Sequence, residues 1–461
     1  MPISRSREAA YQILRRVESG RAFAVDLLQT EQISKLREVD RRLVTELVMG
    51  VLRWRGDLDF RIERLSGKPL DYFDPEVATV LRLSIYQIRL LEKIPKAAAV
   101  NEAVELVKAA RKRSAAGLVN AVLRKCEPAP NLRGAAHQGL TDQLRDWPGR
   151  DPEALESACR SLPPWLLERW ERHFGPEAAR SLAWLTLLTP PTTLRVAGGA
   201  GAPEEIAREL AREGTKVRRG KYAPQAWVVE SGDVRSSQAW REGCIAIQDE
   251  ASQLVGALVA PERGQRVLDL CAAPGTKTAQ LASALGSGTL VASDLSVRRL
   301  RTMARLLRPF PDPLRLHLVR LDATRSLPFG VEFERILVHA PCSGTGTLAR
   351  NPEIKWRLEQ GDLARLAALQ AAMLQNALEV LAPGGRLVYV TCSLEPEENE
   401  QVVEKVLAEE QAVRLVGRDT LAREFPDFAP LFGPDGYFRT RPDRDSMDGF
   451  FAAVIVREGL G

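Results

Sequence analysis

The first quarter of the chain has the hydrophobic spacing of amphipathic helices. Within residues 5–126, apolar positions recur every three to four residues, as in REAAYQILRRVESG, so that they fall on one helix face. Glycine and proline separate these segments, because both interrupt a helix. The pattern predicts an all-helical domain over residues 1–128. Residues 129–152 are rich in proline, glycine and polar side chains without a steady period, which predicts a linker.

The hydrophobic period changes twice in the rest of the chain. Over residues 153–240, a helical segment precedes strand, helix and strand patterns, which predicts a small α/β subdomain resembling an RNA-recognition fold. It lacks the aromatic signature of a base-stacking sheet, so we expect a scaffold. Over residues 241–461, short apolar runs alternate with helical segments. This alternation predicts a doubly wound, mainly parallel α/β sheet of Rossmann-like type, which binds ligands at the carboxyl ends of its strands.

The amino-acid composition indicates a globular protein. Of the 461 residues, 45% are hydrophobic and 27% are charged, which is typical of a globular protein. The chain has no uncharged apolar run of about 18 residues and no signal-peptide core at its start, so we expect a cytoplasmic protein without a membrane partner. The six cysteines and four histidines are scattered without a CxxC pair. We therefore expect neither a metal site nor a disulfide framework.

Charge is distributed unevenly along the chain. Residues 1–126 contain 24 Lys and Arg against 16 Asp and Glu, a net of +8, so the remainder carries −3 of the total +5. A basic helical domain predicts a polyanionic partner, although solvated Arg-rich helix faces would give the same count. Two cationic runs are candidates for contacts with that partner: Arg53-Trp54-Arg55 and Arg111-Lys112-Arg113. Trp54 is either a base-stacking side chain or a core residue.

A single glycine marks the turn after the first strand of the predicted parallel sheet. The segment RVLDLCAAPGTKTAQLA places Gly275 where a helix N-terminus meets a cofactor. The G-x-G-x-x-G and Walker A patterns both fail, because the loop has no other glycine. Asp294 and Asp322 end the next two strands, where carboxylates can accept from ribose hydroxyls and an adenine amino group. Each acid alone is typical of a helix cap, but the set predicts S-adenosylmethionine rather than a dinucleotide.

Two cysteines follow two further strands of the predicted sheet. Cys342 stands in a Pro-Cys pair and Cys392 in a Thr-Cys pair. Adjacent strands lie about 5 Å apart, so we expect both thiols to face one pocket. A lone free cysteine is commonly a core residue, whereas two beside a methyl donor indicate chemistry. Carbon 5 of cytosine becomes a nucleophile when a thiolate adds to carbon 6, so the pair predicts cytosine methylation.

These segments resemble the RNA cytosine-C5 methyltransferase family, specifically its RsmB (Sun/Fmu) branch. The matching segments include CAAPGTKT, HAPCSGTGTLARNPEIKWR, TCSLEPEENE, YQIRLLEKIPKAAAVNEAVELVK and SMDGFFAAV. The resemblance implies a NusB-like RNA-binding domain over residues 1–128 and a class I methyltransferase domain over residues 241–461. It implies one cytosine of 16S rRNA as substrate, in naked RNA or an early small-subunit particle. Nothing in the sequence indicates more than a monomer.

The resemblance also implies roles for individual residues. It makes Cys392 the nucleophile and Cys342 the group that assists product release, and it places Lys277 near the methionine end or the base. DNA cytosine methyltransferases use the Pro-Cys thiol instead, so the presence of both thiols indicates RNA. The implied cofactor-binding residues are Cys271, Ala272, Ala273, Pro274, Gly275, Thr276, Lys277, Asp294, Asp322 and His339.

Two positions depart from the family pattern. Thr276 stands where the family has a second glycine, and a β-branched residue there is strained only if φ is positive. His339 stands where the family has aspartate, between cofactor and base. An imidazole there can donate a hydrogen bond to the cytosine edge, or protonate nitrogen 3 as a cation, but its ordinary pKa of about 6.5 leaves it mostly neutral. We expect a functional but slower enzyme.

Two other functions stay open at the level of sequence. One is a catalytically impaired RNA-binding or ribosome-assembly factor of the same family, which His339 favours and the intact cysteines disfavour. The other is a different enzyme on the same sheet, either a dehydrogenase or a DNA methyltransferase. The missing G-x-G-x-x-G pattern argues against the dehydrogenase, and Cys392 argues against the DNA enzyme.

Overall fold

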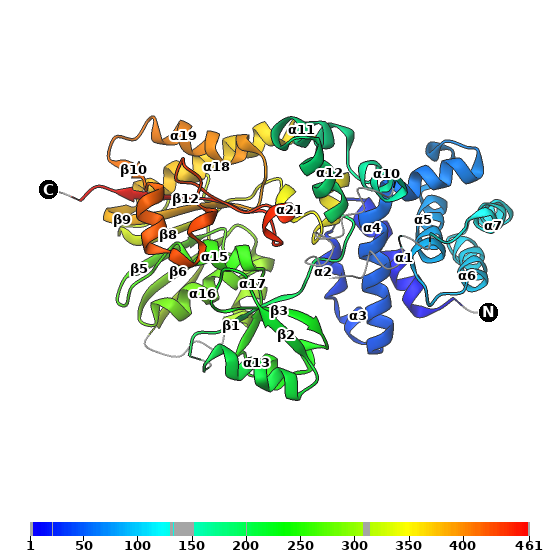
Figure 1. Ribbon diagram of the computed structural model, residues 1–461, viewed down its shortest axis with the longest axis horizontal. Coiled ribbons are helices and arrows are strands. Elements are labelled where there is room, and N and C mark those ends of the chain that lie inside the picture. Colours follow the sequence, from blue (N-terminus) through cyan, green and yellow to red (C-terminus); the bar gives the residue numbers. More distant parts are fainter. Residues whose placement is uncertain are drawn as a thin grey trace. The chain divides into compact units, whose positions relative to one another are not determined.

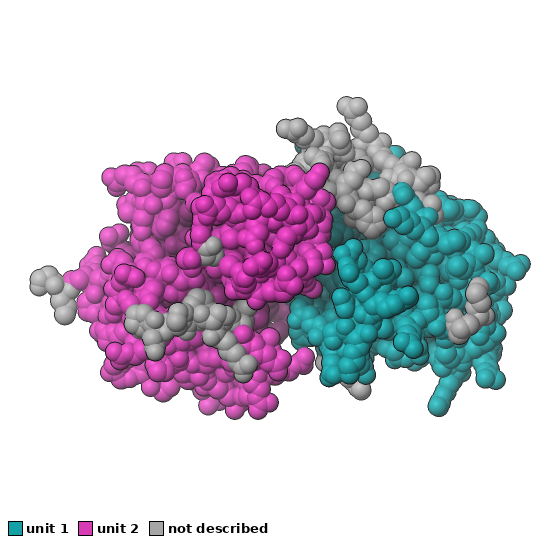
Figure 2. Space-filling view, turned by 90° about the horizontal axis from the view of Figure 1, so that it is seen from below, with its two compact units in different colours: residues 1–190, 348–360 teal, residues 191–347, 361–461 magenta. Residues whose placement is uncertain are grey.

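The chain divides between two units, and neither is continuous in sequence. Unit 1 comprises residues 1–190 and 348–360, and unit 2 comprises residues 191–347 and 361–461 (Figure 2). The computed structural model describes residues 3–20, 22–129, 132, 152–199, 201–307 and 314–459. Most of the predicted linker, residues 133–151, lies outside the described residues. The domain boundaries drawn from the sequence stay predictions.

Unit 1 is helical, as the 3.6-residue period predicts. Its described helices are α1 (Arg5–Glu18), α2 (Ala24–Leu28), α3 (Glu31–Ser34), α4 (Glu38–Ser66), α5 (Pro75–Leu90), α6 (Lys96–Ala109), α7 (Ala116–Lys125), α10 (Pro152–Arg160), α11 (Pro164–Phe174) and α12 (Pro176–Leu185) (Figure 1). Proline begins α5, where its missing N–H is not needed. Every residue of α5 from Val77 to Leu90 is buried, so this helix is the centre of the bundle, packed against α1, α4, α6 and α7.

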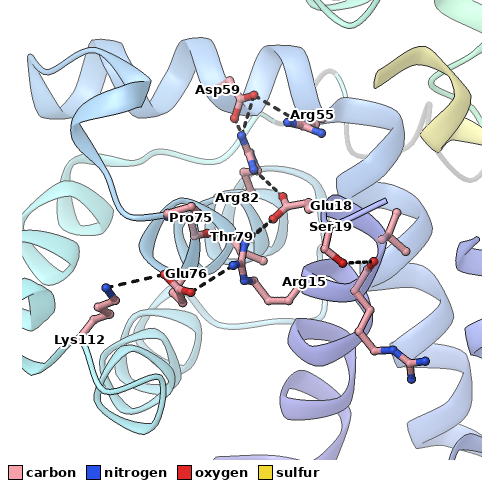
Figure 3. A network of polar contacts seen from close by, with 12 residues as sticks. Arg15, Glu18, Ser19, Arg55, Asp59, Pro75, Glu76, Thr79, Arg82 and Lys112 are labelled. Carbon is pink, nitrogen blue, oxygen red and sulfur yellow. Dashed lines mark hydrogen bonds and ion pairs between the residues drawn. The ribbon is translucent and has the colours of Figure 1, made fainter. Parts of the chain in front are cut away.

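A buried arginine on α5 organises a polar network inside this bundle (Figure 3). Arg82 is 4% exposed, and its guanidinium holds Asp59 through two hydrogen bonds of 2.5 and 3.0 Å. A third hydrogen bond of 2.6 Å runs to Glu18, which also accepts from Thr79 at 2.9 Å and from Arg15 at 3.0 Å. The network ties α1, α4 and α5 together, because its members come from all three helices.

Replacing Arg82 with alanine should destabilise unit 1. The change leaves the carboxylates of Glu18 and Asp59 without their shared cation, and breaking a buried pair in this way costs about 3–5 kcal/mol. Urea unfolding followed by far-UV circular dichroism measures the loss. Lys112→Ala is the control, since the exposed Lys112–Asp74 pair (2.9 Å) should contribute little. Equal midpoints for the two variants would contradict this role of Arg82.

The first cationic run is buried rather than available to a polyanion. Trp54 is 1% exposed and packs edge-to-face on Trp184, with ring centroids 6.3 Å apart, so it is a core residue. Arg53 is 6% exposed and donates to the Ala349 carbonyl at 2.9 Å. Of the two interpretations of Trp54, the core residue is confirmed, and Arg53 is too buried to serve as an exposed cation of the first run. Arg111 and Arg113, in the second run, are exposed.

Residues 348–360 belong to unit 1 although they lie between two strands of unit 2. Lys355 is 1% exposed and donates to the Arg53 carbonyl at 2.7 Å, while Trp356 Nε1 donates to the Leu52 carbonyl at 2.7 Å. Glu353 accepts from the Ala24 N–H at 2.7 Å. Arg357 donates to the carbonyls of Val17 and Ala22 at 2.7 and 2.5 Å. This segment is thus fixed to α4 and to the loop after α1 by charged and aromatic side chains.

Unit 2 begins with a small antiparallel sheet in the strand order β2-β3-β1-β4. Its strands are β1 (Thr193–Val196), β2 (Lys216–Arg219), β3 (Ala226–Ser231) and β4 (Ile245–Ile247), accompanied by α13 (Pro203–Arg212) and α14 (Gln238–Arg241). Leu194, Trp227 and Ile245 share a core with Ile206 and Leu210 of α13. The sequence predicts β1, α13 and β3 of this module. The first part of the predicted subdomain, residues 153–190, belongs to unit 1, and β4 lies beyond residue 240.

The large sheet of unit 2 has the order β10-β12-β9-β8-β5-β6-β7 and is parallel from β9 to β7. Its strands are β5 (Arg266–Leu270), β6 (Gly288–Asp294), β7 (Leu314–Arg320), β8 (Phe333–His339), β9 (Leu381–Thr391), β10 (Val413–Leu415), β11 (Phe438–Arg439) and β12 (Phe451–Arg457). β12 runs antiparallel to β9, and β10 and β11 pair with β12. The mainly parallel sheet predicted from the strand–helix alternation is confirmed.

Helices cover both faces of this sheet (Figure 1). They are α15 (Glu250–Ala257), α16 (Thr276–Leu285), α17 (Val297–Leu306), α18 (Asp362–Glu379), α19 (Glu400–Leu407) and α20 (Arg418–Glu424), while the short α21 (Pro442–Asp445) connects β11 to β12. Val267 of β5 packs into one core with α15 and α16, and its neighbour Leu268 packs into another with α18 and α19. Successive strand residues face opposite sides, so both layers are apolar. Within the described ranges, no helix combines the length and apolarity needed to cross a bilayer.

Candidate functional site

The loop after β5 turns sharply into α16. Cys271 has φ 60° and Gly275 has φ 105°, so the chain adopts a left-handed conformation at both ends of the loop. The Gly275 N–H donates to the Ala272 carbonyl at 2.9 Å, which closes the turn. Thr276 is the first residue of α16 and has a helical backbone, so threonine in place of a second glycine adds no strain. The loop presents the N-terminus of α16 at the carboxyl edge of the sheet.

Two acids lie at neighbouring strand ends beside this loop. Asp294 ends β6, is 5% exposed, and accepts from the Ser296 N–H at 2.9 Å. Asp322 lies two residues beyond β7 and accepts from the N–H and hydroxyl of Thr324 at 3.1 and 2.7 Å. The Thr324 hydroxyl lowers the pKa of Asp322. Because β6 pairs with both β5 and β7, both carboxylates and the loop share one sheet edge.

The two strand-end cysteines meet. Sγ of Cys342, after β8, lies 3.5 Å from Sγ of Cys392, after β9, and both thiols are free and half-buried. The strands set this proximity, since β8 and β9 pair in parallel with His339 opposite Val390. The loops are also joined directly, by a 3.0 Å hydrogen bond from the Gly346 N–H to the Cys392 carbonyl.

The two thiols have opposite pKa shifts. The pKa of Cys392 is lowered, first because the Cys342 thiol donates a hydrogen bond to it and further because the Lys277 cation lies near. The pKa of Cys342 is raised well above its ordinary value by the same hydrogen bond and by burial. Of the two thiols, Cys392 is therefore the more readily deprotonated.

Phe450 links the lysine and the histidine of the site. Lys277 is 7% exposed, and its amino group lies 5.2 Å from the centre of the Phe450 ring. The His339 ring stacks on Phe450, with centroids 6.1 Å apart and planes inclined by 25°. Burial lowers the pKa of Lys277. The structure thus gathers His339, Lys277 and the two thiols around the ends of β8 and β9.

His339 is held as a neutral imidazole. Burial lowers its pKa well below the ordinary value, and the cations Lys277 and Arg299 lower it further. Its Nε2 atom is buried and has no hydrogen-bond partner among the described residues. A neutral imidazole has one donor and one acceptor nitrogen, so a hydrogen bond to a ring edge suits this site better than proton donation from a cation.

The residues present fit S-adenosylmethionine. The loop offers a helix N-terminus without the glycines that a pyrophosphate needs, and Asp294 and Asp322 supply acceptors at the two adjacent strand ends. Asp269 of β5 is 1% exposed, and in the described structure its Oδ1 atom has no partner, while Oδ2 accepts from the Thr278 hydroxyl at 2.5 Å. Burial raises the pKa of Asp269 to about 7. Unsatisfied buried polar atoms at this edge are typical of a ligand site.

Several residues of the site were missed by sequence reasoning: Asp269, Ser343, Ser393, Glu398, Asn399 and Phe450. A signal for some of them was present, because a serine follows each strand-end cysteine directly. Asn399 fixes the Thr-Cys turn, accepting from the Thr391 hydroxyl at 2.5 Å and donating to the Ser393 carbonyl at 3.0 Å. Glu398 and Asn399 stand in an acidic run that would ordinarily be a solvated helix start.

Three family models match separate regions of the chain. A family model described as 16S rRNA methyltransferase RsmB/F matches residues 256–456. The NusB family matches residues 4–128, and a methyltransferase RsmF/B-like, ferredoxin-like domain matches residues 162–235. The three matched ranges cover the helical, small α/β and large-sheet regions.

Curated relatives and solved structures match over nearly the full length. The probable ribosomal RNA small subunit methyltransferase B of Bacillus subtilis is 32% identical over 98% of this chain and 99% of its own. The ribosomal RNA small subunit methyltransferase B of Pseudomonas putida is 34% identical over 98% of both chains. The crystal structure of PH0851 has the same fold, with a TM-score of 0.76 over 99% of both chains at 23% identity. The resemblance carried by the sequence motifs is confirmed.

Proposed function

Because the chain belongs to the 16S rRNA methyltransferase RsmB/F family, we propose that it methylates carbon 5 of one cytosine in 16S rRNA. The observation that carries the proposal is the thiol pair, 3.5 Å apart, in which the pKa of Cys392 is lowered and that of Cys342 is raised. Such a pair supplies a nucleophile and a protonated partner at one position. We further propose that the protein acts as a cytoplasmic monomer on naked rRNA or an early small-subunit particle.

In this proposal each thiol has a separate task. The Cys392 thiolate adds to carbon 6 of the flipped cytosine, which makes carbon 5 nucleophilic. Bound S-adenosylmethionine supplies the electrophilic methyl group. Solvent water accepts the carbon-5 proton, the electron pair of that C–H bond re-forms the double bond between carbons 5 and 6, and Cys392 leaves as a thiolate that can again accept the Cys342 hydrogen bond. Cys342 assists this release, and Lys277 stabilises the Cys392 thiolate beforehand.

The cofactor is held by the chain's own strand ends. We assign residues 271–277 to the methionine and sulfonium side, Asp294 to the ribose hydroxyls and Asp322 to the adenine amino group. His339 orients the cytosine by a hydrogen bond from its neutral imidazole. The exposed cations Arg111 and Arg113 of unit 1 are proposed to contact the RNA backbone.

The test of the proposed function is transfer of labelled methyl groups from S-adenosylmethionine to 16S rRNA, with the product base mapped. One labelled 5-methylcytosine supports the proposal. A methyl group on another base, or on another atom of cytosine, would exclude the thiol mechanism. Cofactor binding without any transfer, to rRNA or to small-subunit particles, would favour an RNA-binding assembly factor.

His339 leads to a prediction about pH. Its lowered pKa means that the cation exists only at acid pH, so the rate should not fall as pH rises from 6 to 8. The lowered pKa of Cys392 means that the rate should rise with pH, with its midpoint below the pKa of an ordinary cysteine thiol. Single-turnover rates measured across this range check both directions.

His339→Asp is the companion variant. An acceptor-only carboxylate restores the residue that the family carries, and we expect a rate increase of about tenfold, the effect of one better hydrogen bond in the transition state. A decline in the native rate between pH 6 and 8 that disappears in His339→Asp would instead establish a cationic His339. A silent native protein beside an active His339→Asp would identify a non-catalytic family member.

A further inference from the structure

A buried carboxylate lies between the two cysteine loops. Glu398, at the end of a short 3-10 helix (Pro396–Glu398), is 0% exposed. Its Oε1 atom accepts from the Ser343 N–H at 2.8 Å and from Gln370 Nε2 at 2.9 Å. Its Oε2 atom accepts from the hydroxyls of Ser343 and Ser393, the latter at 2.5 Å. Both serines directly follow a candidate cysteine.

We infer that Glu398 is a positioning residue, which ties the loop of Cys342 to the loop of Cys392 and thereby fixes the separation of the two thiols. This inference rests on the proposed function for its catalytic meaning. The geometric part stands on the hydrogen bonds alone, because one side chain joins the residues after β8 and after β9 and a third element, α18, through Gln370.

A carboxylate suits this task because its oxygens accept hydrogen bonds and donate none. Its two oxygens can hold four donors at once, and all four donors here are N–H or O–H groups. The backbone of Glu398 is fixed as well, since its carbonyl accepts from the Tyr389 hydroxyl at 2.7 Å. Burial raises the pKa of Glu398, and the bonds from Ser343, Ser393 and Gln370 oppose that rise. A buried charge is costly unless it is satisfied in this way.

The role of Glu398 is geometric rather than electrostatic. Its negative charge raises the pKa of both thiols and so opposes thiolate formation at Cys392. The other groups that face Cys392 are the Cys342 thiol, the Lys277 cation and the Asp448 carboxylate. A residue that works against the thiolate and still holds four donors serves to place the sulfur atoms.

Three substitutions separate placement from charge. Glu398→Ala removes the link and should lower kcat by about 100-fold, the effect of a misplacement of roughly 1 Å, with KM for RNA and S-adenosylmethionine nearly unchanged. Glu398→Gln keeps the contacts, because its carbonyl can accept from both N–H groups while its amide donates to both serine oxygens. It should retain most of kcat, and its pH profile should move to lower pH because the charge is gone. Glu250→Ala is the matched control.

The control removes a comparable carboxylate from the same unit. Glu250 is 5% exposed and accepts from the N–H groups of Tyr222 and Ala223, which lie outside both cysteine loops. Glu250→Ala should lower the melting temperature while kcat is kept. Equal losses of kcat in Glu250→Ala and Glu398→Ala, at equal stability, would overturn the inference. So would a Glu398→Gln variant as slow as Glu398→Ala.

A second readout does not need methyl transfer. With Sγ atoms 3.5 Å apart, Cys342 and Cys392 should close a disulfide readily under a mild oxidant such as diamide, followed by peptide mapping. Closure should slow by about tenfold or more in Glu398→Ala and hardly change in Glu398→Gln, because effective concentration depends on orientation. A native chain that closes this disulfide but transfers no methyl group would refute the proposed function and leave the positioning role intact. Unchanged closure in Glu398→Ala would refute the positioning role.

Discussion

Replacing Cys392 with alanine should lower methyl transfer to 16S rRNA on the order of 10⁴-fold or more, because it removes the sulfur atom that is proposed to add to carbon 6 of the cytosine. The fold should survive, since the side chain is half-buried and the smaller alanine leaves the turn held by Asn399. Labelled-methyl transfer measures the rate, and binding of S-adenosylmethionine by calorimetry should remain at its native level.

Cys244→Ala is the matched control for this variant. Cys244 is also a free, half-buried cysteine of unit 2, but it packs with the small sheet rather than the site. It should leave the rate unchanged. A Cys392→Ala protein that retains a tenth of the native rate would exclude Cys392 as the nucleophile and direct attention to Cys342.

Replacing Cys342 with alanine should also lower turnover strongly, but at a different step. The first addition and methyl transfer proceed from Cys392, while release fails, so a covalent protein–RNA complex should accumulate to near one equivalent. Turnover should fall by about 10²- to 10⁴-fold, the range for loss of an acid–base group. A band that survives denaturing electrophoresis and disappears with ribonuclease reports the complex, and its formation should require S-adenosylmethionine.

The double variant tests which of the two cysteines forms the covalent bond to RNA. Cys342→Ala combined with Cys392→Ala should give no covalent complex, because the bond to RNA is made by Cys392. If the complex instead forms in Cys392→Ala and is absent in Cys342→Ala, the two roles are exchanged. Loss of the Cys342 hydrogen bond should also raise the pKa of Cys392, so adduct formation should need a higher pH than native single turnover does.

The sequence could predict those features of the fold and the site that follow from local hydrophobic periodicity and from the order of strands along the chain. The 3.6-residue period was enough for the helical unit, and the rule that parallel strands end at one edge was enough to bring Cys342 and Cys392 together. It could not predict that Trp54 packs on Trp184, because a tryptophan on a helix looks the same whether it meets a base or another ring. Burial is a property of the partner surface, which the local pattern does not contain.

The same limit applies to the polar part of the site. Glu398 stands in Glu-Pro-Glu-Glu-Asn-Glu, where acids normally face water, and only the return of the chain from β9 brings it to Ser343. Phe450 is 173 positions from Lys277 and meets it because β12 inserts beside β9. These contacts depend on how strands pair in the folded protein. Motif spacing alone therefore predicts the two cysteines of the site but not the residues that hold them in place.

Residues 348–360 have a consequence for how such proteins can be recombined. In sequence this segment interrupts unit 2, but it belongs to unit 1, where Lys355 and Trp356 donate hydrogen bonds to backbone carbonyls of α4. A catalytic half that begins at residue 191 would leave Trp356 and Lys355 without the carbonyls that accept their hydrogen bonds. A chimera in which another domain replaces unit 1 therefore needs three chain junctions, after residues 190, 347 and 360, rather than one.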